Sequence, residues 1–505
     1  MRKNVLWVDD EIEFLRSHVA FLETRGYSVT PASSGEEALR LIHEGGCDVY
    51  DMVLLDKQMP IKSGSATLGE IKAICPDLPV VMLTGCQHGT DAACPEEYDG
   101  SLPKPIDPDR LLLACQRAID SRRQRTSHKI SDKYFRYYTD THARLNSMLS
   151  ASGWMDFYAS LIKWDIEMEG ADCEAMRQTH TGFKFDVGKC FGNFATENYV
   201  EWAKGSGNGR PLMSVDIIKK AVVPELRDGR SVLMVVLSGV RLNQFFAIEP
   251  EIKKNFSAKA ARFMTVLPTT PDFCMTALAS GLYPDEAAAV EPEAFETRAR
   301  HDPAIMKRLM SAGLERVWTD AAKTFFTDAN GAGAKRRIKA ALDAMKKTPV
   351  FGIVALDPVD QFIDAESDGT QRELIREWFA GSEIFAMIKE ACSDSCTVIL
   401  TSDRGHVYCT SASEVYEMPK IDDAPRCIFG KRLSIDEREA FLLEEPRHFR
   451  LPQLADGIKC AMARENFYFT MPGKKQGPAD HRSGGISLEE MVMPIYICRP
   501  IVVPL

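Results

Sequence analysis

Three acidic residues, Asp357, Asp360 and Asp364, stand at spacings of three and four in the stretch LDPVDQFID. On a helix these spacings would place the carboxylates along one face, where they repel one another unless a cation lies between them. Carboxylate oxygens are the ligands that hard cations such as Mg²⁺ and Ca²⁺ prefer. The stretch therefore raises the hypothesis of a metal site.

A second set of chemically active residues lies near the start of the chain. Asp9, Asp10 and Asp56 offer hard oxygen ligands suited to Mg²⁺, which can bridge an incoming phosphoryl group. Asp56 is then the nucleophile. Thr84 can donate a hydrogen bond to a phosphoryl oxygen while Lys104 neutralises its charge. This constellation predicts a phosphorylation switch.

These residues follow apolar runs that alternate with amphipathic helical stretches. Four runs read as strands, KNVLWV, YSVTPA, MVLLD and LPVVMLT, and a weaker fifth precedes Lys104. The alternation predicts an α/β domain over residues 1–120 with a five-stranded parallel sheet wound on both faces. Because active groups lie at the C-terminal ends of such strands, we expect the acids, the hydroxyl and the lysine to meet at one edge.

The segment resembles the receiver domain of bacterial response regulators. The matching stretches are VDD (8–10), LLDKQMP (54–60), LTG (83–85) and KP (104–105). The resemblance implies Asp56 as phosphoacceptor, a magnesium site at Asp9, Asp10 and Asp56, and Thr84 and Lys104 as switch residues. One position departs from the pattern, since the aromatic residue expected three places before the lysine is Ser101; Tyr98 is the alternative.

Residues 121–210 predict a helical bundle that links two domains. SRRQRTSHKISDK is basic and polar, and we interpret it as a connector with a hinge. The stretches that follow carry apolar residues at spacings of three and four, which is typical of packed helices. Trp154, Trp164 and Trp202 are predicted to lie in the core of this bundle or against a neighbouring domain.

The region 211–505 reads as a second, larger α/β domain. SVLMVVLSGV, TPVFGIVALD and SCTVILTSDRG are typical of buried strands, each followed by polar residues where a site would lie. Residues 285–348 are mixed in charge and helical in pattern, and we interpret them as a helical cap over that site. Together with LPTTPDFCMTALASGLYP and GGISLEEMVMP, these stretches resemble the PglZ domain of the alkaline phosphatase superfamily.

The order of receiver, helical bundle and PglZ domain is similar to that of the PorX-like response regulators of the type IX secretion system. That resemblance covers almost the whole chain, and in the family the PglZ domain holds a two-zinc phosphodiesterase site. Here only Asp360 and Asp403 match the family's site residues. Other residues replace its nucleophilic threonine and its remaining ligands: Ser238, Pro271, Asp364, Arg404 and Ser483.

These replacements disfavour zinc in the PglZ domain. Zinc sites favour four donors rich in nitrogen and sulfur, and two aspartates cannot complete two of them. Arg404 adds a fixed positive charge that would pair with Asp403. One alternative is a single hard cation held by Asp360 and Asp364.

Another alternative is a site rebuilt from Asp360, Asp403, His406 and His481. His406 lies two places after Arg404 and His481 two before Ser483, so each shares a face of an extended strand with a lost ligand. Thr269 and Thr270 are the corresponding candidates for a shifted nucleophile. We expect instead that Thr270, Pro271 and Asp272 begin a helix as its N-cap and first turn.

The composition of the chain disfavours several classes of function. With 62 basic and 72 acidic residues the formal net charge is −10, which opposes non-specific binding to nucleic acid. No apolar run approaches the ~20 residues of a membrane span, so we expect a cytoplasmic protein. The 14 cysteines lack paired metal spacing and are interpreted as reduced, ordinary thiols.

The preferred hypothesis is a response regulator switched by phosphorylation of Asp56, whose degenerate PglZ domain binds or dimerises in secretion or gene-expression signalling. The alternative is a metal-dependent phosphodiesterase or phosphatase gated by the receiver. Direct DNA binding is disfavoured because no compact basic helix-turn-helix follows the receiver. The resemblance implies three partners: a sensor histidine kinase, an alternative sigma factor or secretion component, and a second copy of the chain on phosphorylation.

Overall fold

The computed structural model divides the chain into two units. The first comprises residues 1–139 and 170–176, and the second comprises residues 140–169 and 177–505. The structure describes residues 2–85, 98–145, 149–169, 173–205, 209–295, 301–318, 323–331, 333–345, 350–362, 367–416, 425–473 and 480–501, without the side chains of Arg144 and Asp360. None of the helices in these ranges combines the length and apolarity that a bilayer span requires.

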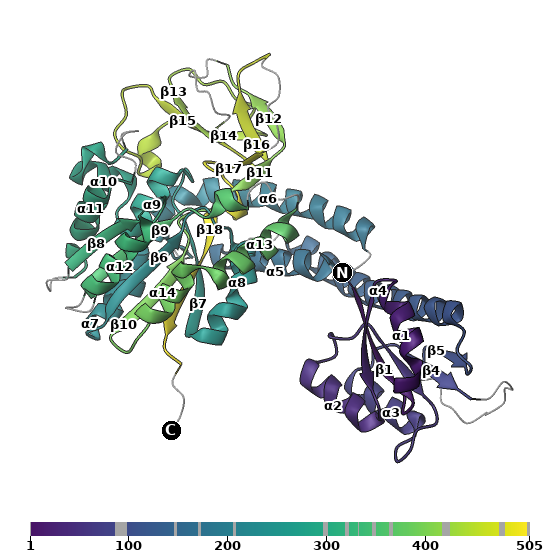
Figure 1. Ribbon diagram of the computed structural model, residues 1–505. Coiled ribbons are helices and arrows are strands. Elements are labelled where there is room, and N and C mark those ends of the chain that lie inside the picture. The colour runs from purple at the N-terminus through teal and green to yellow at the C-terminus, as the bar shows by residue number, and fades with distance from the viewer. Residues whose placement is uncertain are drawn as a thin grey trace. The chain divides into compact units, whose positions relative to one another are not determined.

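The first unit contains a five-stranded parallel sheet in the order β2-β1-β3-β4-β5, as the alternation of apolar runs predicts. Its strands are β1 (Lys3–Val8), β2 (Tyr27–Ala32), β3 (Met52–Asp56), β4 (Val80–Thr84) and β5 (Gly100–Pro103). Its helices are η1 (Ile12–Leu15), α1 (Arg16–Glu23), α2 (Gly35–Gly45), α3 (Gly64–Ile74) and α4 (Pro108–Leu145). Separate apolar clusters join α2 and α3 to one face of the sheet and α1 and α4 to the other (Figure 1).

Helix α4 runs without a break through the basic stretch that the sequence suggested as a connector. Residues 121–133 are therefore helical, and their role as a hinge stays a prediction. Arginine and lysine have high helix propensity, and no proline or glycine interrupts this stretch. The residues of α4 from Asp140 onward group with the second unit.

A disulfide joins Cys47, after α2, to Cys75, the C-cap of α3. The interpretation of every cysteine as an ordinary reduced thiol is wrong for this pair. The two residues are 28 positions apart, and packing of α2 beside α3 brings their Cα atoms to 5.6 Å. The bond therefore ties together two helices on the same face of the sheet.

Two long helices open the second unit, α5 (Ala151–Glu169) and α6 (Glu174–Ala203). Trp154, Trp164 and Trp202 are buried, which confirms the prediction from the apolar spacing. The ring of Trp154 meets that of Phe191 edge to face at 5.7 Å, an arrangement that favours close aromatic packing. Aromatic side chains thus hold α5 against α6.

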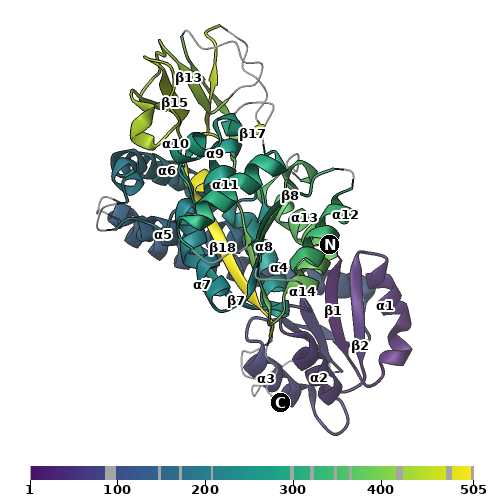
Figure 2. The same ribbon diagram turned by 90° about the vertical axis from the view of Figure 1, so that its left-hand side faces the viewer.

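A six-stranded sheet in the order β7-β18-β10-β6-β9-β8 forms the centre of the second unit (Figures 1 and 2). Strands β10, β6, β9 and β8 run parallel, while β18 and β7 are antiparallel to their neighbours. The strands are β6 (Ser231–Leu237), β7 (Ser257–Met264), β8 (Lys323–Asp328), β9 (Val350–Leu356), β10 (Cys396–Thr401) and β18 (Val492–Arg499). Strands β6, β9 and β10 are buried throughout, as expected for strands covered on both faces.

Helices cover both faces of this sheet. One apolar cluster contains η3 (Ile218–Val222), α7 (Val223–Arg227), α9 (Pro271–Ser280), α10 (Pro284–Val290) and α11 (Pro303–Glu315). The other contains α8 (Leu242–Asn255), α12 (Ala334–Met345), α13 (Asp368–Gly381) and α14 (Glu383–Ala391). Short helical turns complete the set: η2 (Ser214–Asp216), η4 (Pro292–Phe295), η5 (Val359–Gln361), η6 (Pro446–Phe449) and α15 (Leu488–Met491).

Three small sheets follow β10 along the chain and lie together in Figure 1. They pair β11 (Val407–Cys409) with β17 (Asp480–Arg482), β12 (Ser411–Glu414) with β16 (Phe467–Thr470), and β15 (Lys459–Ala463) with both β13 (Cys427–Gly430) and β14 (Ala440–Leu443). Within the range predicted as a helical cap, β8 is an edge strand of the main sheet that the sequence pattern did not indicate.

Candidate functional site

Three carboxylates converge at the C-terminal edge of the first sheet. Asp9 follows β1 and Asp56 ends β3, its neighbour, and both are buried. With the exposed Asp10 they bring one oxygen each to within 4.8 Å of one another. This is the only such group of three potential ligands among the described residues, and its all-oxygen chemistry fits Mg²⁺.

Lys104 lies between two of these carboxylates. Its Nζ donates to Asp56 Oδ2 at 2.7 Å and to Asp9 Oδ2 at 2.9 Å. Burial by itself would lower the pKa of Lys104, but the hydrogen bonds to Asp56 and Asp9 outweigh it and raise that pKa. The lysine therefore stays charged and neutralises part of the acidic cluster.

Thr84, the predicted switch hydroxyl, and Ser101, where an aromatic residue was expected, lie on the neighbouring strands β4 and β5. Thr84 ends β4, where its Oγ1 is 3.5 Å from the carbonyl oxygen of Leu102. Ser101 lies exposed on β5, paired with Met82, and Tyr98 is partly exposed just before that strand. The structure thus brings Asp9, Asp10, Asp56 and Lys104 into one cluster, with Thr84 at the same edge.

In the second unit, Arg404 lies at the C-terminal ends of the parallel strands β6 and β10. Ser238 directly follows β6, and Asp403 lies two residues beyond the neighbouring β10. The Arg404 guanidinium donates to Ser238 Oγ at 2.8 Å, to Asp403 Oδ2 at 2.7 Å and to Ser483 Oγ at 3.2 Å. Three of the replaced family positions are therefore linked to one another by hydrogen bonds.

Charge balance explains this arrangement. Arg404 is almost completely buried, which would lower its pKa, but Asp403 and Asp357 outweigh burial and raise it. The remaining oxygen of Asp403 accepts a hydrogen bond from the backbone N–H of Gly239 at 3.2 Å. A fixed cation with its counterion thus occupies this edge, and the donor set does not fit a pair of zinc ions.

Pro271 lies beside Arg404 in a cavity of about 170 Å³ that also contacts Ser238 and Asp357. It begins α9 with Thr270 in the N-cap position, as predicted, although the Thr270 side chain makes no capping hydrogen bond. Thr269 is fully buried, and its hydroxyl donates to the carbonyl oxygen of Gly485 at 2.8 Å. Its contacts are therefore those of a structural residue.

The stretch that suggested a metal site does not form a continuous helix. Its described part contains only the single turn η5, and Asp357 lies exposed before that turn. Its Oδ1 accepts from the backbone N–H of Val359 at 3.3 Å, so this acid caps the turn. Asp364 and the side chain of Asp360 lie outside the described residues.

His406 directly precedes β11 and His481 lies on β17, and these two strands pair with each other. Their ring centroids are 4.7 Å apart and their planes are perpendicular. His406 Nδ1 donates to the carbonyl oxygen of Gly239 at 2.8 Å, whereas Asp403 bonds to Arg404. No three-ligand group involving these histidines occurs among the described residues.

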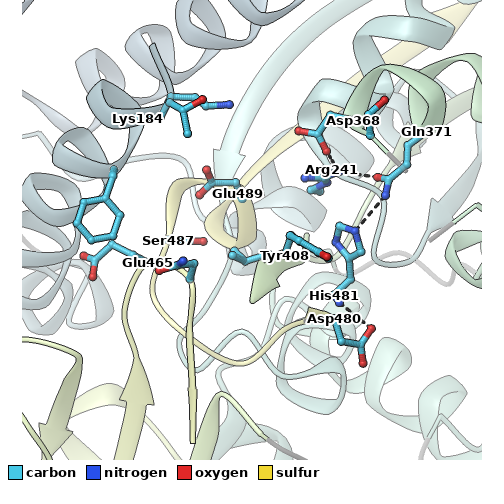
Figure 3. Close-up of a pocket in the computed structure, with 16 residues that line it drawn as sticks. Lys184, Arg241, Asp368, Gln371, Tyr408, Glu465, Asp480, His481, Ser487 and Glu489 are labelled. Carbon is cyan, nitrogen blue, oxygen red and sulfur yellow. Dashed lines mark hydrogen bonds and ion pairs between the residues drawn. The ribbon is translucent and has the colours of Figure 1, made fainter. Parts of the chain in front are cut away.

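His481 belongs to a hydrogen-bond network that also contains Arg241. Its guanidinium donates to Gln371 Oε1 and to Asp368 Oδ1, both at 2.7 Å. Because Oε1 of Gln371 accepts from Arg241, its amide nitrogen faces His481 Nε2 at 3.0 Å (Figure 3). Burial would raise the pKa of Asp368, but Arg241 outweighs it and holds that pKa well below its usual range.

The stretch GGISLEE is held by an arginine that sequence reasoning missed. Arg426 and Glu490 are both fully buried, and the guanidinium donates to Glu490 at 3.0 Å and 2.9 Å. Glu490 also accepts from the backbone N–H of Gly485 at 2.8 Å. A glutamate inside an apolar motif signals that a cation must lie nearby, but only the fold selects Arg426, 64 residues away.

Comparison with protein-family models finds three consecutive matches. They are a response regulator receiver domain over residues 5–116, a PorX response regulator linker domain over residues 124–203, and a BREX system PglZ alkaline phosphatase-like domain over residues 217–497. The last match spans more than half of the chain. The order of receiver, linker and PglZ region is the order that the sequence analysis predicted.

Curated relatives match only part of the chain. The Transcriptional regulatory protein CpxR homolog of Haemophilus influenzae is 38% identical over 130 residues, which are 25% of this chain and 55% of that protein. Transcriptional regulatory protein ZraR of Escherichia coli K12 is 36% identical over 119 residues, 23% of this chain and 26% of that protein. A crystal structure of a response regulator receiver domain protein from Clostridium thermocellum matches at 36% identity and a TM-score of 0.22, covering 24% of this chain and 95% of that one.

Replacement of Arg426 by methionine should destabilise the second unit strongly, because it leaves the Glu490 carboxylate buried without a cation. We expect a loss of about 3–5 kcal/mol in the free energy of unfolding, measured by urea denaturation. Arg40→Met, which breaks an exposed pair with Glu44 on α2, is the matched control and should change stability by less than about 1 kcal/mol. Equal effects of the two substitutions would contradict the role of Arg426.

The buried His406 predicts a pH-dependent stability. Burial, Arg241 and His481 lower its pKa well below 6.5, so the folded protein holds it neutral. Below pH ~6.5 the unfolded chain takes up a proton that the folded chain does not, so stability falls as pH decreases, by at most ~1.4 kcal/mol per pH unit. His406→Gln should flatten the unfolding free energy between about pH 7 and pH 5 relative to wild type. Parallel curves for both proteins would show that His406 makes no such contribution.

Proposed function

Because this chain belongs to the family of PglZ alkaline phosphatase-like domains and carries a receiver and a PorX linker domain before it, we propose that it is a two-component response regulator switched by phosphorylation of Asp56. Its PglZ domain then acts as a catalytically degenerate effector that binds partners in secretion or gene-expression signalling. The observation that carries the proposal is the cluster of Asp9, Asp10 and Asp56 with Lys104 bonded across it.

The geometry of the receiver supports transfer of a phosphoryl group to Asp56. Asp9, Asp10 and Asp56 would hold Mg²⁺, which supplies positive charge next to the phosphoryl oxygens. Lys104 already reaches Asp56 Oδ2 at 2.7 Å, so a small shift would carry its ammonium from the carboxylate to a phosphoryl oxygen. Thr84, on the adjacent β4, can turn its hydroxyl toward the same group and transmit the change along β4 and β5.

The second unit supports an effector that does not hydrolyse phosphodiesters. Arg404 donates to Ser238, Asp403 and Ser483, which in the family are positions for metal ligands. Pro271 offers no hydroxyl at the position of the nucleophile. This domain therefore has a binding role that does not involve zinc chemistry.

The partners follow from the chemistry of each part. A receiver domain implies a phosphodonor such as a histidine kinase. We propose that phosphorylation brings two copies of the chain together. We also propose that the PglZ domain then engages an alternative sigma factor or a secretion component.

Radiolabelled acetyl phosphate with Mg²⁺ should label the protein, and Asp56→Ala should abolish the label because it removes the accepting carboxylate. Asp10→Asn should reduce labelling, since it removes one oxygen ligand from the magnesium site. Asp51→Asn is a matched control, because Asp51 accepts a backbone hydrogen bond from Asn4 and lies outside the cluster. Labelling that survives Asp56→Ala would refute Asp56 as the acceptor.

The purified protein should contain far less zinc than a two-zinc site holds, and it should not cleave a nitrophenyl phosphodiester when metal is added. Elemental analysis and the release of nitrophenol measure these quantities. A variant that combines Ser238→Asp, Pro271→Thr, Asp364→His, Arg404→His and Ser483→His restores the family's residue types and should gain zinc. Robust metal-dependent turnover by the unchanged protein would establish an enzyme instead.

A further inference from the structure

A pocket of about 610 Å³ lies within the second unit, away from the cavity beside Arg404. Helix α6 forms one wall through Lys184, Phe185 and Gly188. The opposite wall comes from the start of α8, the start of α13, the β11–β17 pair and the turn between β15 and β16 (Figure 3). Most of its lining residues are polar or charged, and Phe185, Val407 and Tyr408 add apolar surface, so it suits a ligand with both kinds of group.

Both protein cations that line the pocket already have carboxylate partners. Arg241 bonds to Asp368 at 2.7 Å, and Lys184 bonds to both oxygens of Asp165 at 2.9 Å. Neither cation therefore adds net positive charge to the pocket. An anionic ligand would have to displace one of these carboxylates.

Glu465 is the opposite case, a buried carboxylate that forms no ion pair among the described residues, although the charges of Arg464, Arg426 and Lys189 favour its ionised form. It is 8% exposed, and its Oε1 has no hydrogen-bond partner among the described residues. Helix α6 packs against this side chain at Gly188, where a Cβ would lie 3.5 Å from Glu465 Cγ, an ordinary van der Waals contact. A larger side chain at Gly188 would therefore compete with Glu465 for space.

A second carboxylate faces the same pocket. The half-buried Glu489 lines the pocket, and its charge helps to raise the pKa of Arg241. In Figure 3 Glu489 lies between Glu465 and the group formed by Arg241, Asp368 and Gln371. Burial raises the pKa of Glu465 to about 7, and Glu489 raises it further against the lowering effect of nearby arginines and Lys189.

We propose that this pocket binds a small organic cation whose ammonium or guanidinium group is held by Glu465 and Glu489. A buried acceptor without a donor indicates that the missing partner is a hydrogen-bond donor, and a positive donor also balances the charge. Phe185 and Tyr408 are 46% and 51% exposed at this pocket, and their ring faces suit a cation with an apolar body.

A bare metal ion fits the pocket less well than an organic cation. Neither Glu465 nor Glu489 belongs to a group of three potential ligands within 4.8 Å in the described ranges. The volume is also many times the ~30 Å³ of one water molecule. Because the ligand would touch α6 and the turn that carries Glu465, it would strengthen the contact between the helical linker and the domain that follows it.

Two chemically distinct probes test the proposal, spermidine for ammonium and agmatine for guanidinium. Isothermal titration of the full-length protein, with Mg²⁺ present to occupy the acidic cluster of the receiver, should show saturable binding of at least one probe. Glu465→Gln keeps the shape of the side chain but removes its charge, and it should weaken binding by about tenfold or more. Without a probe, the same variant should melt at a higher temperature near pH ~8, because it removes a buried charge that lacks a partner.

Substitutions at two glycines of α6, Gly188 and Gly182, provide a test variant and a matched control that leave the charges of the pocket unchanged. Gly188→Leu places a side chain in the pocket and should abolish binding, whereas Gly182 does not line the pocket and a Cβ there would meet no atom within 4 Å. Gly182→Leu should therefore bind like the wild type while sharing the gain in helix propensity.

Failure to bind either probe would overturn the proposal, as would binding that persists unchanged in Glu465→Gln and Gly188→Leu. Binding of Zn²⁺ or Mg²⁺ that depends on Glu465, without binding of either amine, would assign the pocket to a metal and refute the organic cation. None of these outcomes bears on phosphorylation of Asp56, which is read from the labelling of a different residue.

Discussion

A charge removed from water has to be met by an opposite charge or by hydrogen bonds, and this constraint shapes the charged clusters in the described parts of both units. Desolvation of an unpaired ion costs several kcal/mol, a large part of the stability of a folded domain. In the first unit, Lys104 meets Asp9 and Asp56. In the second, Arg404 meets Asp403 and Arg426 meets Glu490.

The same rule leads to different chemistry in the two units. In the receiver the acids outnumber the lysine, so the cluster still has capacity for a divalent cation and a phosphoryl group. Beside β6 and β10 the charges already balance, because the guanidinium of Arg404 pairs with the carboxylate of Asp403. Glu465 departs from this pattern among the described residues, because its buried Oε1 has no donor, and for that reason it points to a ligand.

Sequence reasoning succeeded where the information is local or repeated along the chain. The parallel sheet of the receiver and the burial of Trp154 follow from the spacing of apolar residues. The convergence of Asp9 with Asp56 follows because parallel strands end at one edge. The basic stretch at residues 121–133 is helical because its side chains are good helix formers, whereas its interpretation as a hinge stays a prediction.

The order of the parts could be predicted from the sequence, because it depends on residue type and on position along the chain. The same kind of reasoning yields the predictions that Asp56 accepts a phosphoryl group and that Pro271 takes the place of a nucleophile. Which charges meet depends on how the chain packs. Packing joins Arg426 to Glu490, links Arg404 to Ser238, Asp403 and Ser483, and leaves Glu465 Oε1 buried without a donor among the described residues. The physical reason is that partners in a buried ion pair are chosen by distance in space, and residues far apart in the sequence become neighbours only when the sheets and helices pack.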